Sequence, residues 1–151
     1  MDETMHCRFM KLALVEAEKA FDLGEVPIGA VIVKNGKVIG KGHNTRELSE
    51  SAIAHAEINA IQDACQNMGH WRLTDCVLYV TIEPCPMCVG AIYQSRIKTV
   101  YFGSRDPKGG ACGSVFNLFD FQGLNHYCQI VEGVLSRECS DVMKRFFKRL
   151  R

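Results

Sequence analysis

Two short motifs in this sequence contain residues that could bind a metal ion and move a proton. The first holds His55 and Glu57, and the second holds Cys85 and Cys88. One imidazole and two thiolates make three zinc ligands, whereas a structural zinc site normally has four from the protein. A site with three protein ligands keeps its fourth position for water, so the motifs favour a catalytic zinc centre.

The carboxylate of Glu57 remains for acid/base chemistry. Water bound to zinc has a pKa of about 7 but still needs a group that carries its proton to the leaving atom. Two positions after His55, Glu57 is expected near the metal without being a ligand, which suits a general acid/base. The motifs therefore predict a zinc hydrolase. The alternative is a purely structural zinc site, in which another cysteine is the fourth ligand and Glu57 lies on the surface.

The elements expected to position these motifs are a mixture of helices and strands. Apolar residues spaced three and four apart indicate helices, and Asn35-Gly36 between two apolar runs indicates a hairpin. We expect helices over 4–23, 54–67, about 84–95 and about 136–150, a short helical piece near 115–119, and strands over 29–33, 37–40, 76–82, 99–102 and 129–132. This order predicts an α/β domain, a mixed sheet covered by helices on both faces.

Both motifs are expected at helix starts. His55 and Glu57 fall in the first turn of one helix, and Cys85 and Cys88 open the next, where Pro84 and Pro86 suit a helix N-terminus. Unpaired amides and the positive end of the helix dipole stabilise thiolates, the form that binds metal. Two helix N-termini are therefore predicted to face one zinc ion.

Composition argues against several other classes of protein. A length of 151 residues fits one domain, and a net charge of +1 is not that of a general polyelectrolyte binder. No apolar stretch approaches the roughly 20 residues of a membrane span, and charged residues near the start leave no apolar signal-peptide region. We therefore expect a cytoplasmic protein without a membrane partner. Eight cysteines spread along such a chain do not indicate a disulfide framework.

Charge is concentrated at the C-terminal end. Residues 137–151 contain six basic side chains and two acidic ones, a net charge of +4. These cations could complement the negative end of a helix, or they could contact phosphates. The loop 103–113, with four glycines and the charged residues Arg105, Asp106 and Lys108, is expected to be mobile and exposed.

Several segments resemble the bacterial tRNA-specific adenosine deaminases over essentially the full chain. They include the residues 54–58 and 81–92 around the two motifs, a signature of zinc nucleobase deaminases, and the segments 25–31, 42–44, 95–97, 103–106, 124–126 and 146–148. The resemblance implies a single deaminase domain over 1–151 with the cytidine deaminase-like fold, a three-layer α/β/α domain with a five-stranded mixed sheet. It also implies a homodimer that hydrolyses adenosine to inosine at the wobble position of a tRNA anticodon.

The resemblance also implies roles for individual residues. One Zn²⁺ per subunit would be held by His55, Cys85 and Cys88, while Glu57 shuttles the proton as zinc-activated water attacks C6 of the purine and ammonia leaves. Asn44 would hydrogen-bond the target nucleoside. The pocket around it would be formed by Val26, Pro27, Ile28 and Ala56.

Contacts with the tRNA anticodon arm are implied in two places. Asp106 and Lys108 resemble the family's loop residues, and the C-terminal residues Arg145, Phe146, Phe147, Lys148 and Arg149 resemble its RNA-facing helix. The sequence departs from the family's commonest pattern at Ser51-Ala52-Ile53, which replaces Asp-Pro-Thr, and in the loop 107–110. Both departures touch the substrate side rather than the zinc chemistry.

Two other functions share part of this pattern. Deaminases of a free nucleobase or nucleoside, of the guanine or cytosine type, can carry the same zinc motifs, and a noncatalytic zinc-dependent RNA-binding module is a third possibility. The loop 103–113 and the basic C-terminal end favour RNA, because extended backbone contact needs exposed cations and a single-stranded loop can present a splayed base.

Overall fold

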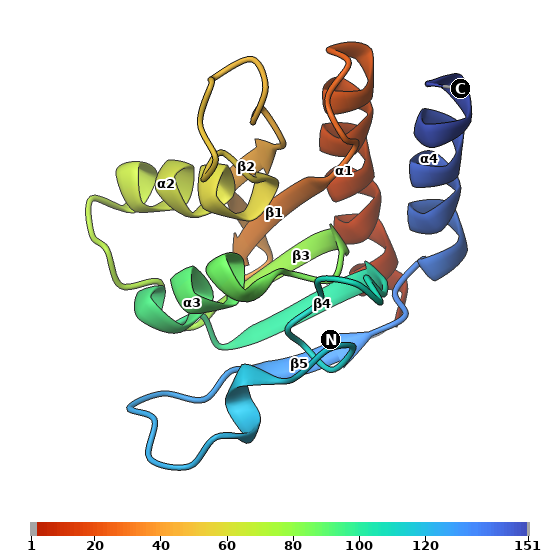
Figure 1. The fold of residues 1–151 in the computed structure, drawn as a ribbon. Helices are drawn as coiled ribbons and strands as arrows, with labels where there is room; N and C mark the ends of the chain where they lie inside the picture. The colour runs from red at the N-terminus through yellow and green to blue at the C-terminus, as the bar shows by residue number, and fades with distance from the viewer. Residues whose placement is uncertain (1–2, 151) are drawn as a thin grey trace.

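A central five-stranded mixed sheet organises the protein. The computed structural model describes residues 3–150. The strands are β1 (Gly29–Lys34), β2 (Lys37–His43), β3 (Cys76–Ile82), β4 (Thr99–Ser104) and β5 (Gln129–Glu132), and their order across the sheet is β2-β1-β3-β4-β5 (Figure 1). β1 is antiparallel to β2 and β3, whereas β3, β4 and β5 run parallel. The predicted mixed sheet is confirmed.

Helices cover both faces of this sheet. The helices α2 (Ala56–Met68) and α3 (Pro86–Ser95) lie on one face, and α1 (Glu3–Asp22) and α4 (Ser136–Arg149) lie side by side on the other (Figure 1). Alternate residues of β3 serve the two cores: Leu78 and Val80 pack toward α2 and α3, and Tyr79 packs with Phe9 of α1. The predicted three-layer α/β/α fold is thereby confirmed.

Local sequence explains most of the element boundaries. Asn35 and Gly36 both adopt the left-handed conformation, with φ of 52° and 75°, as a tight hairpin turn between β1 and β2 requires. The expected spans of β3 and β5 are confirmed, whereas β2 continues to His43 and β4 to Ser104. The short helical piece is a 3-10 turn at Leu118–Asp120, a few residues later than expected.

The start of α2 differs from the expected one in a way that matters for the site. His55 has an extended backbone, with φ of −77° and ψ of 158°, and is the N-cap, so the helix begins at Ala56 rather than two residues earlier. Cys85 is likewise the extended N-cap of α3. One ligand thus precedes each helix, and their side chains point toward the same space. Within residues 3–150, no helix combines the length and apolar composition needed to cross a bilayer.

Candidate active site

The two predicted motifs meet at the N-termini of α2 and α3. The Sγ atoms of Cys85 and Cys88 lie 3.7 and 3.6 Å from Nδ1 of His55. Zinc–sulfur and zinc–nitrogen bond lengths in a tetrahedral site correspond to a sulfur–nitrogen separation of about 3.6 Å. Within residues 3–150 these three side chains form the one group of His, Cys, Asp and Glu with metal-binding spacing. The donor set and its spacing therefore fit zinc.

The thiols of this cluster are coupled to each other. A hydrogen bond from Cys88 lowers the pKa of Cys85 to about 5, and donating that bond raises the pKa of Cys88. Main-chain amides at the start of α3 and the imidazole of His55 also lower the pKa of Cys85. Cys85 is thus poised as a thiolate at neutral pH, which is the state that binds a metal ion.

Glu57 lies beside this cluster but outside the ligand set. Its residue is only 4% exposed, and burial raises the pKa of its carboxyl group to about 7. A general acid/base works best when its pKa is near the working pH. Glu57 thus lies near the cluster without joining it, as expected from the sequence, and its role as a proton shuttle stays a prediction.

A small hollow of about 160 Å³ opens next to His55. Four of the five residues expected to hold the nucleoside line it: Val26, Ile28, Asn44 and Ala56. The fifth, Pro27, is buried. The Asn44 amide donates to the Val26 carbonyl at 3.2 Å and accepts from the Arg46 backbone N–H at 3.1 Å, so Asn44 joins two walls of the hollow. One amide hydrogen of Asn44 remains for a ligand.

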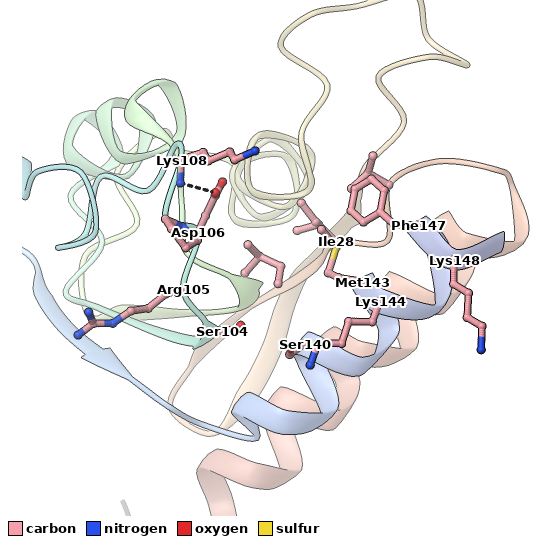
Figure 2. A pocket seen from close by; sticks show the side chains of 13 residues that line it. Ile28, Ser104, Arg105, Asp106, Lys108, Ser140, Met143, Lys144, Phe147 and Lys148 are labelled. Carbon is pink, nitrogen blue, oxygen red and sulfur yellow. Dashed lines mark hydrogen bonds between the residues drawn. The ribbon is translucent and has the colours of Figure 1, made fainter. Parts of the chain in front are cut away.

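A larger groove of about 830 Å³ adjoins the hollow. Val26 and Ile28 line both. Figure 2 shows Asp106 and Lys108 on one side of the groove and Met143 and Phe147 of α4 on the other. Its walls combine apolar surface with lysine side chains. Such a groove suits a ligand with flat apolar faces and a negative backbone, which is the chemistry of single-stranded nucleic acid.

Some of the residues expected to contact RNA line the groove, and others do not. Asp106 and Lys108 line the groove, although one oxygen of Asp106 already accepts from the Lys108 and Gly109 backbone N–H groups. Phe147 and Lys148 line the opposite wall. Phe146 is only 5% exposed and packs against Phe21 of α1, so its expected RNA contact is corrected to a packing role.

Arg145 and Arg149 stack over the ring of Phe21 on the α1 side, and Arg145 also pairs with Glu18. Neither arginine belongs to the groove lining. Arg151, the last cation of the basic end, lies outside the described residues. The structure therefore divides the expected contact segment into a groove-facing part and a part that fastens α4 to α1.

Several groove and hollow residues were not anticipated from sequence. Ser140, Met143 and Lys144 line the groove with Phe147 and Lys148. Their spacing of three and four along α4 is the signal that could have found them. By contrast, residues 139, 142 and 146 form the buried face.

Glu25, which lines the hollow, is a further residue that the sequence did not identify. It is 1% exposed, and its carboxylate accepts from the backbone N–H groups of Glu47 at 3.1 Å and Leu48 at 2.7 Å. These bonds hold the loop between β2 and α2, which supplies one wall of the hollow. No short motif signals this role, because donor and acceptor lie more than twenty positions apart.

Comparisons with known proteins agree with this geometry. The family model of the MafB19-like deaminases matches residues 4–151. The chain is 50% identical to the tRNA-specific adenosine deaminase of Bacillus subtilis (strain 168) over 143 residues, which are 95% of this chain and 89% of that protein. A structure from studies of A-to-I editing by tRNA:A34 deaminases at the wobble position of transfer RNA matches with a TM-score of 0.86 and 43% identity, covering 89% of this chain and 98% of that one.

A more partial match is to the guanine deaminase of Bacillus subtilis, with a TM-score of 0.62 and 44% identity over 65% of this chain and 63% of that one. At 43–50% identity, the similarity over nearly the whole length of both chains is to the tRNA deaminases, which confirms the resemblance found in the sequence. The chain belongs to the MafB19-like deaminases and, among them, to the family of the bacterial tRNA-specific adenosine deaminases.

Proposed function

We propose that this protein hydrolyses adenosine to inosine at the wobble position of a tRNA anticodon, with Zn²⁺ as its cofactor. The observation that carries the proposal is the meeting of His55, Cys85 and Cys88 beside a buried Glu57, at the edge of a hollow lined by Asn44. The tRNA:A34 deaminase structure, which matches over 98% of its length, supports the same assignment.

In this proposal each residue of the site has a separate role in the reaction. Zinc bound to the three donors would lower the pKa of water to about 7 and so supply the nucleophile at neutral pH. Glu57 accepts a proton from the attacking water while the water oxygen forms a bond to C6 of the purine. Glu57 then returns the proton to the exocyclic amine, so that the C6–N bond breaks and ammonia leaves. Asn44 orients the base, and Val26, Ile28 and Ala56 exclude water around it.

RNA is proposed as the substrate because of the groove beside the hollow. Lys108 and Lys148 offer positive charge to phosphates, and Phe147, which is 45% exposed, offers a ring on which a base flanking the target can stack. The guanine deaminase match supports a free base as the second candidate substrate. We prefer tRNA as the substrate because the groove extends well beyond the space that one base fills.

The experiment that tests the substrate is ammonia release from an anticodon stem-loop with adenosine at the wobble position, with free adenosine, guanine and cytosine in parallel reactions. We expect the stem-loop to react far faster than any of the three. Equal or faster reaction of guanine would transfer the assignment to the free-base class. Stem-loop binding without ammonia release from any substrate would support a noncatalytic RNA-binding module instead.

Organisation and location are part of the proposal. We propose one deaminase domain over residues 1–151, supported by the family match over 4–151. We also propose a homodimer with one zinc ion per subunit, supported by exposed apolar side chains, Val115, Phe116, Phe121 and Tyr127, in the segment after β4. We propose a cytoplasmic location as well, because the proposed substrate is tRNA. Sedimentation velocity of the zinc-loaded protein tests the dimer.

A further inference from the structure

Glu83 is a buried carboxylate to which the reaction proposed above assigns no task. It is 3% exposed and lies two residues before the metal-binding Cys85. Its oxygens accept from the backbone N–H groups of Asp106 at 3.1 Å, Cys112 at 3.0 Å and Ser114 at 3.0 Å, and from the Ser114 hydroxyl. All four donors belong to one segment, residues 105–114, which we call the groove loop.

The fit between Glu83 and the groove loop is close. A Cβ atom added to Gly110 would lie 2.2 Å from Cδ of Glu83, so the glycine leaves the space that the carboxylate occupies. Two backbone bonds join the same regions: the Glu83 N–H donates to the Ser104 carbonyl at 2.9 Å, and the Ala111 N–H donates to the Pro84 carbonyl at 2.9 Å. The groove loop is therefore fastened to the turn that carries the metal ligand.

The fastened loop forms one wall of the groove. The groove loop supplies Asp106 and Lys108 to one wall, and Met143 and Phe147 of α4 supply the other (Figure 2). Arg105, the first residue of the groove loop, pairs on its outer side with Glu132 of β5 at 2.6 Å. On the inner side, the Glu83 carboxylate accepts from Asp106, Cys112 and Ser114, and the Ala111 N–H donates to the Pro84 carbonyl. Glu83 is thus the side chain that joins the start and the end of the loop, and the backbone N–H groups that it binds need an acceptor.

We infer that Glu83 is a positioning residue for substrate recognition: it holds the groove loop at the spacing from α4 that the RNA around the target nucleoside needs. The inference rests on the proposed function and deepens it. Glu83 touches neither the base nor the metal in this account. Its loss should therefore weaken engagement of the RNA while leaving the metal and the proton shuttle in place.

The first test substitutes Glu83→Gln, which keeps the size but turns an amide N–H toward at least one donor. We expect the dissociation constant and KM for the stem-loop to rise about tenfold or more, since small misplacements of a positioning group have effects of that size. Zinc content and kcat should stay close to wild type. The matched control, Glu132→Gln, removes an exposed carboxylate that pairs with the same loop and should leave the dissociation constant unchanged.

The second test reaches the same contact from the other side. Gly110→Ala should raise the same dissociation constant, because its methyl group displaces the carboxylate. The Glu83→Gln/Gly110→Ala double variant should be little worse than the more affected single variant, as expected for two changes that break one interaction. Should Glu83→Gln not fold, Gly110→Ala and Ser114→Ala, which removes one donor, carry the test.

Wild-type affinity for RNA in Glu83→Gln, or a parallel loss of zinc and kcat in that variant, would overturn the inference. The second result would make Glu83 a structural support of the metal turn. These outcomes are separate from the proposed function, which is judged on the wild-type protein. Failure of the wild type to deaminate the stem-loop would overturn the proposed function and this inference with it.

Discussion

Glu57 lies against the metal-binding cluster without belonging to it, and this separation defines the chemistry at the residue scale. The three donors are placed by extended N-cap residues and a first helical turn, whereas Glu57 is buried behind them in α2. A carboxylate in that position is free to exchange protons, because it does not have to neutralise the ion as a ligand. Substitutions at the two kinds of residue should therefore fail in different ways.

Glu57→Gln should keep zinc and bind the stem-loop normally but lose turnover. General acid/base groups contribute about 10² to 10⁴ in rate, so we expect kcat to fall by that range. Single-turnover inosine formation, zinc content and RNA affinity are measured on the same preparation. Glu138→Gln, an exposed carboxylate of α4, is the control. A Glu57→Gln enzyme with near-normal kcat would contradict the shuttle, and one without zinc would make Glu57 a ligand.

Cys88→Ser should lose both zinc and activity, because a serine hydroxyl does not replace a thiolate as a zinc ligand. The matched control is Cys65→Ser, which changes a cysteine of α2 outside the cluster and should retain both. Metal analysis of the purified variants gives the answer directly. Chelation of wild-type protein followed by zinc addition should reproduce the loss and then restore activity. Full zinc occupancy in Cys88→Ser would contradict the proposed ligand set.

The metal ligands could be predicted from sequence because each pair of functional residues sits within one short motif. Phe146 and Phe147 could not be separated in the same way. They are neighbours on α4, yet one is 5% exposed against α1 and the other is 45% exposed in the groove. Which of two adjacent aromatic residues faces inward depends on how the helix is rotated against its neighbours, and this rotation is set by the packed structure.

At the scale of elements, the position of the site depends on how closely α2 approaches β2. A Cβ atom at Gly42 would lie 2.5 Å from the Ala56 carbonyl oxygen and 2.5 Å from the Ala60 nitrogen. The Asn59 amide of α2 also donates to the His43 carbonyl at 2.9 Å. The first turns of α2 are thus held on the end of the hairpin, beside Asn44.

Gly42→Ala should therefore destabilise the protein by about 1–3 kcal/mol, the usual cost of overpacking, and reduce kcat by shifting the start of α2. The matched control is Gly90→Ala in α3, where an added Cβ would have no heavy atom within 4 Å apart from the neighbouring residues and backbone of its own helix. Replacing that helical glycine should stabilise by roughly 0.5–1 kcal/mol. Thermal unfolding and kcat of both variants test this. Equal stability of the two variants would show that the close approach is unimportant.

Glu16 joins α1 to the same hairpin and makes stability depend on pH. Burial on its own would raise the pKa of Glu16, but hydrogen bonds from Lys19 at 2.6 Å and His43 at 3.2 Å outweigh it and hold the pKa below its ordinary value of 4.5. A lowered pKa adds stability above the unfolded value, and this stability is lost as the pH falls through the folded value.

We expect Glu16→Gln to be less stable than wild type by about 1 kcal/mol at neutral pH. The difference should shrink as the pH falls through 4.5, where the carboxyl group of the unfolded chain is half protonated, and further at lower pH. Urea unfolding of both proteins at a series of pH values measures the difference. A gap that stays constant into the acid range would contradict the role assigned to the Glu16 carboxylate.

Elements with strong local patterns were predictable, and the groove loop was not. The run of buried residues in β3 and the Asn35-Gly36 turn carry their own signals. The groove loop was expected to be mobile, yet its backbone is bonded to Glu83, which lies 23 to 31 positions away. Contacts at that separation form only when the chain has folded, so no local pattern reveals them.

At the scale of the whole molecule, the layers bring the reacting centre and the groove to one region. The helices α2 and α3 lie on one face of the sheet and α4 lies on the other (Figure 1). Val26 and Ile28 line both the hollow and the groove and so connect the two. A substrate that reaches both must be larger than a single base. The molecule as a whole therefore favours an anticodon loop with one nucleoside turned into the hollow.

The most direct test of the proposed deamination is to locate inosine in a full-length tRNA that carries adenosine at the wobble position. The tRNA is incubated with zinc-loaded protein, digested, and its nucleosides are located by mass spectrometry. We predict inosine at the wobble position alone, dependent on zinc and absent with Glu57→Gln. Unmodified tRNA in a preparation that consumes guanine, or inosine scattered over other adenosines, would contradict it.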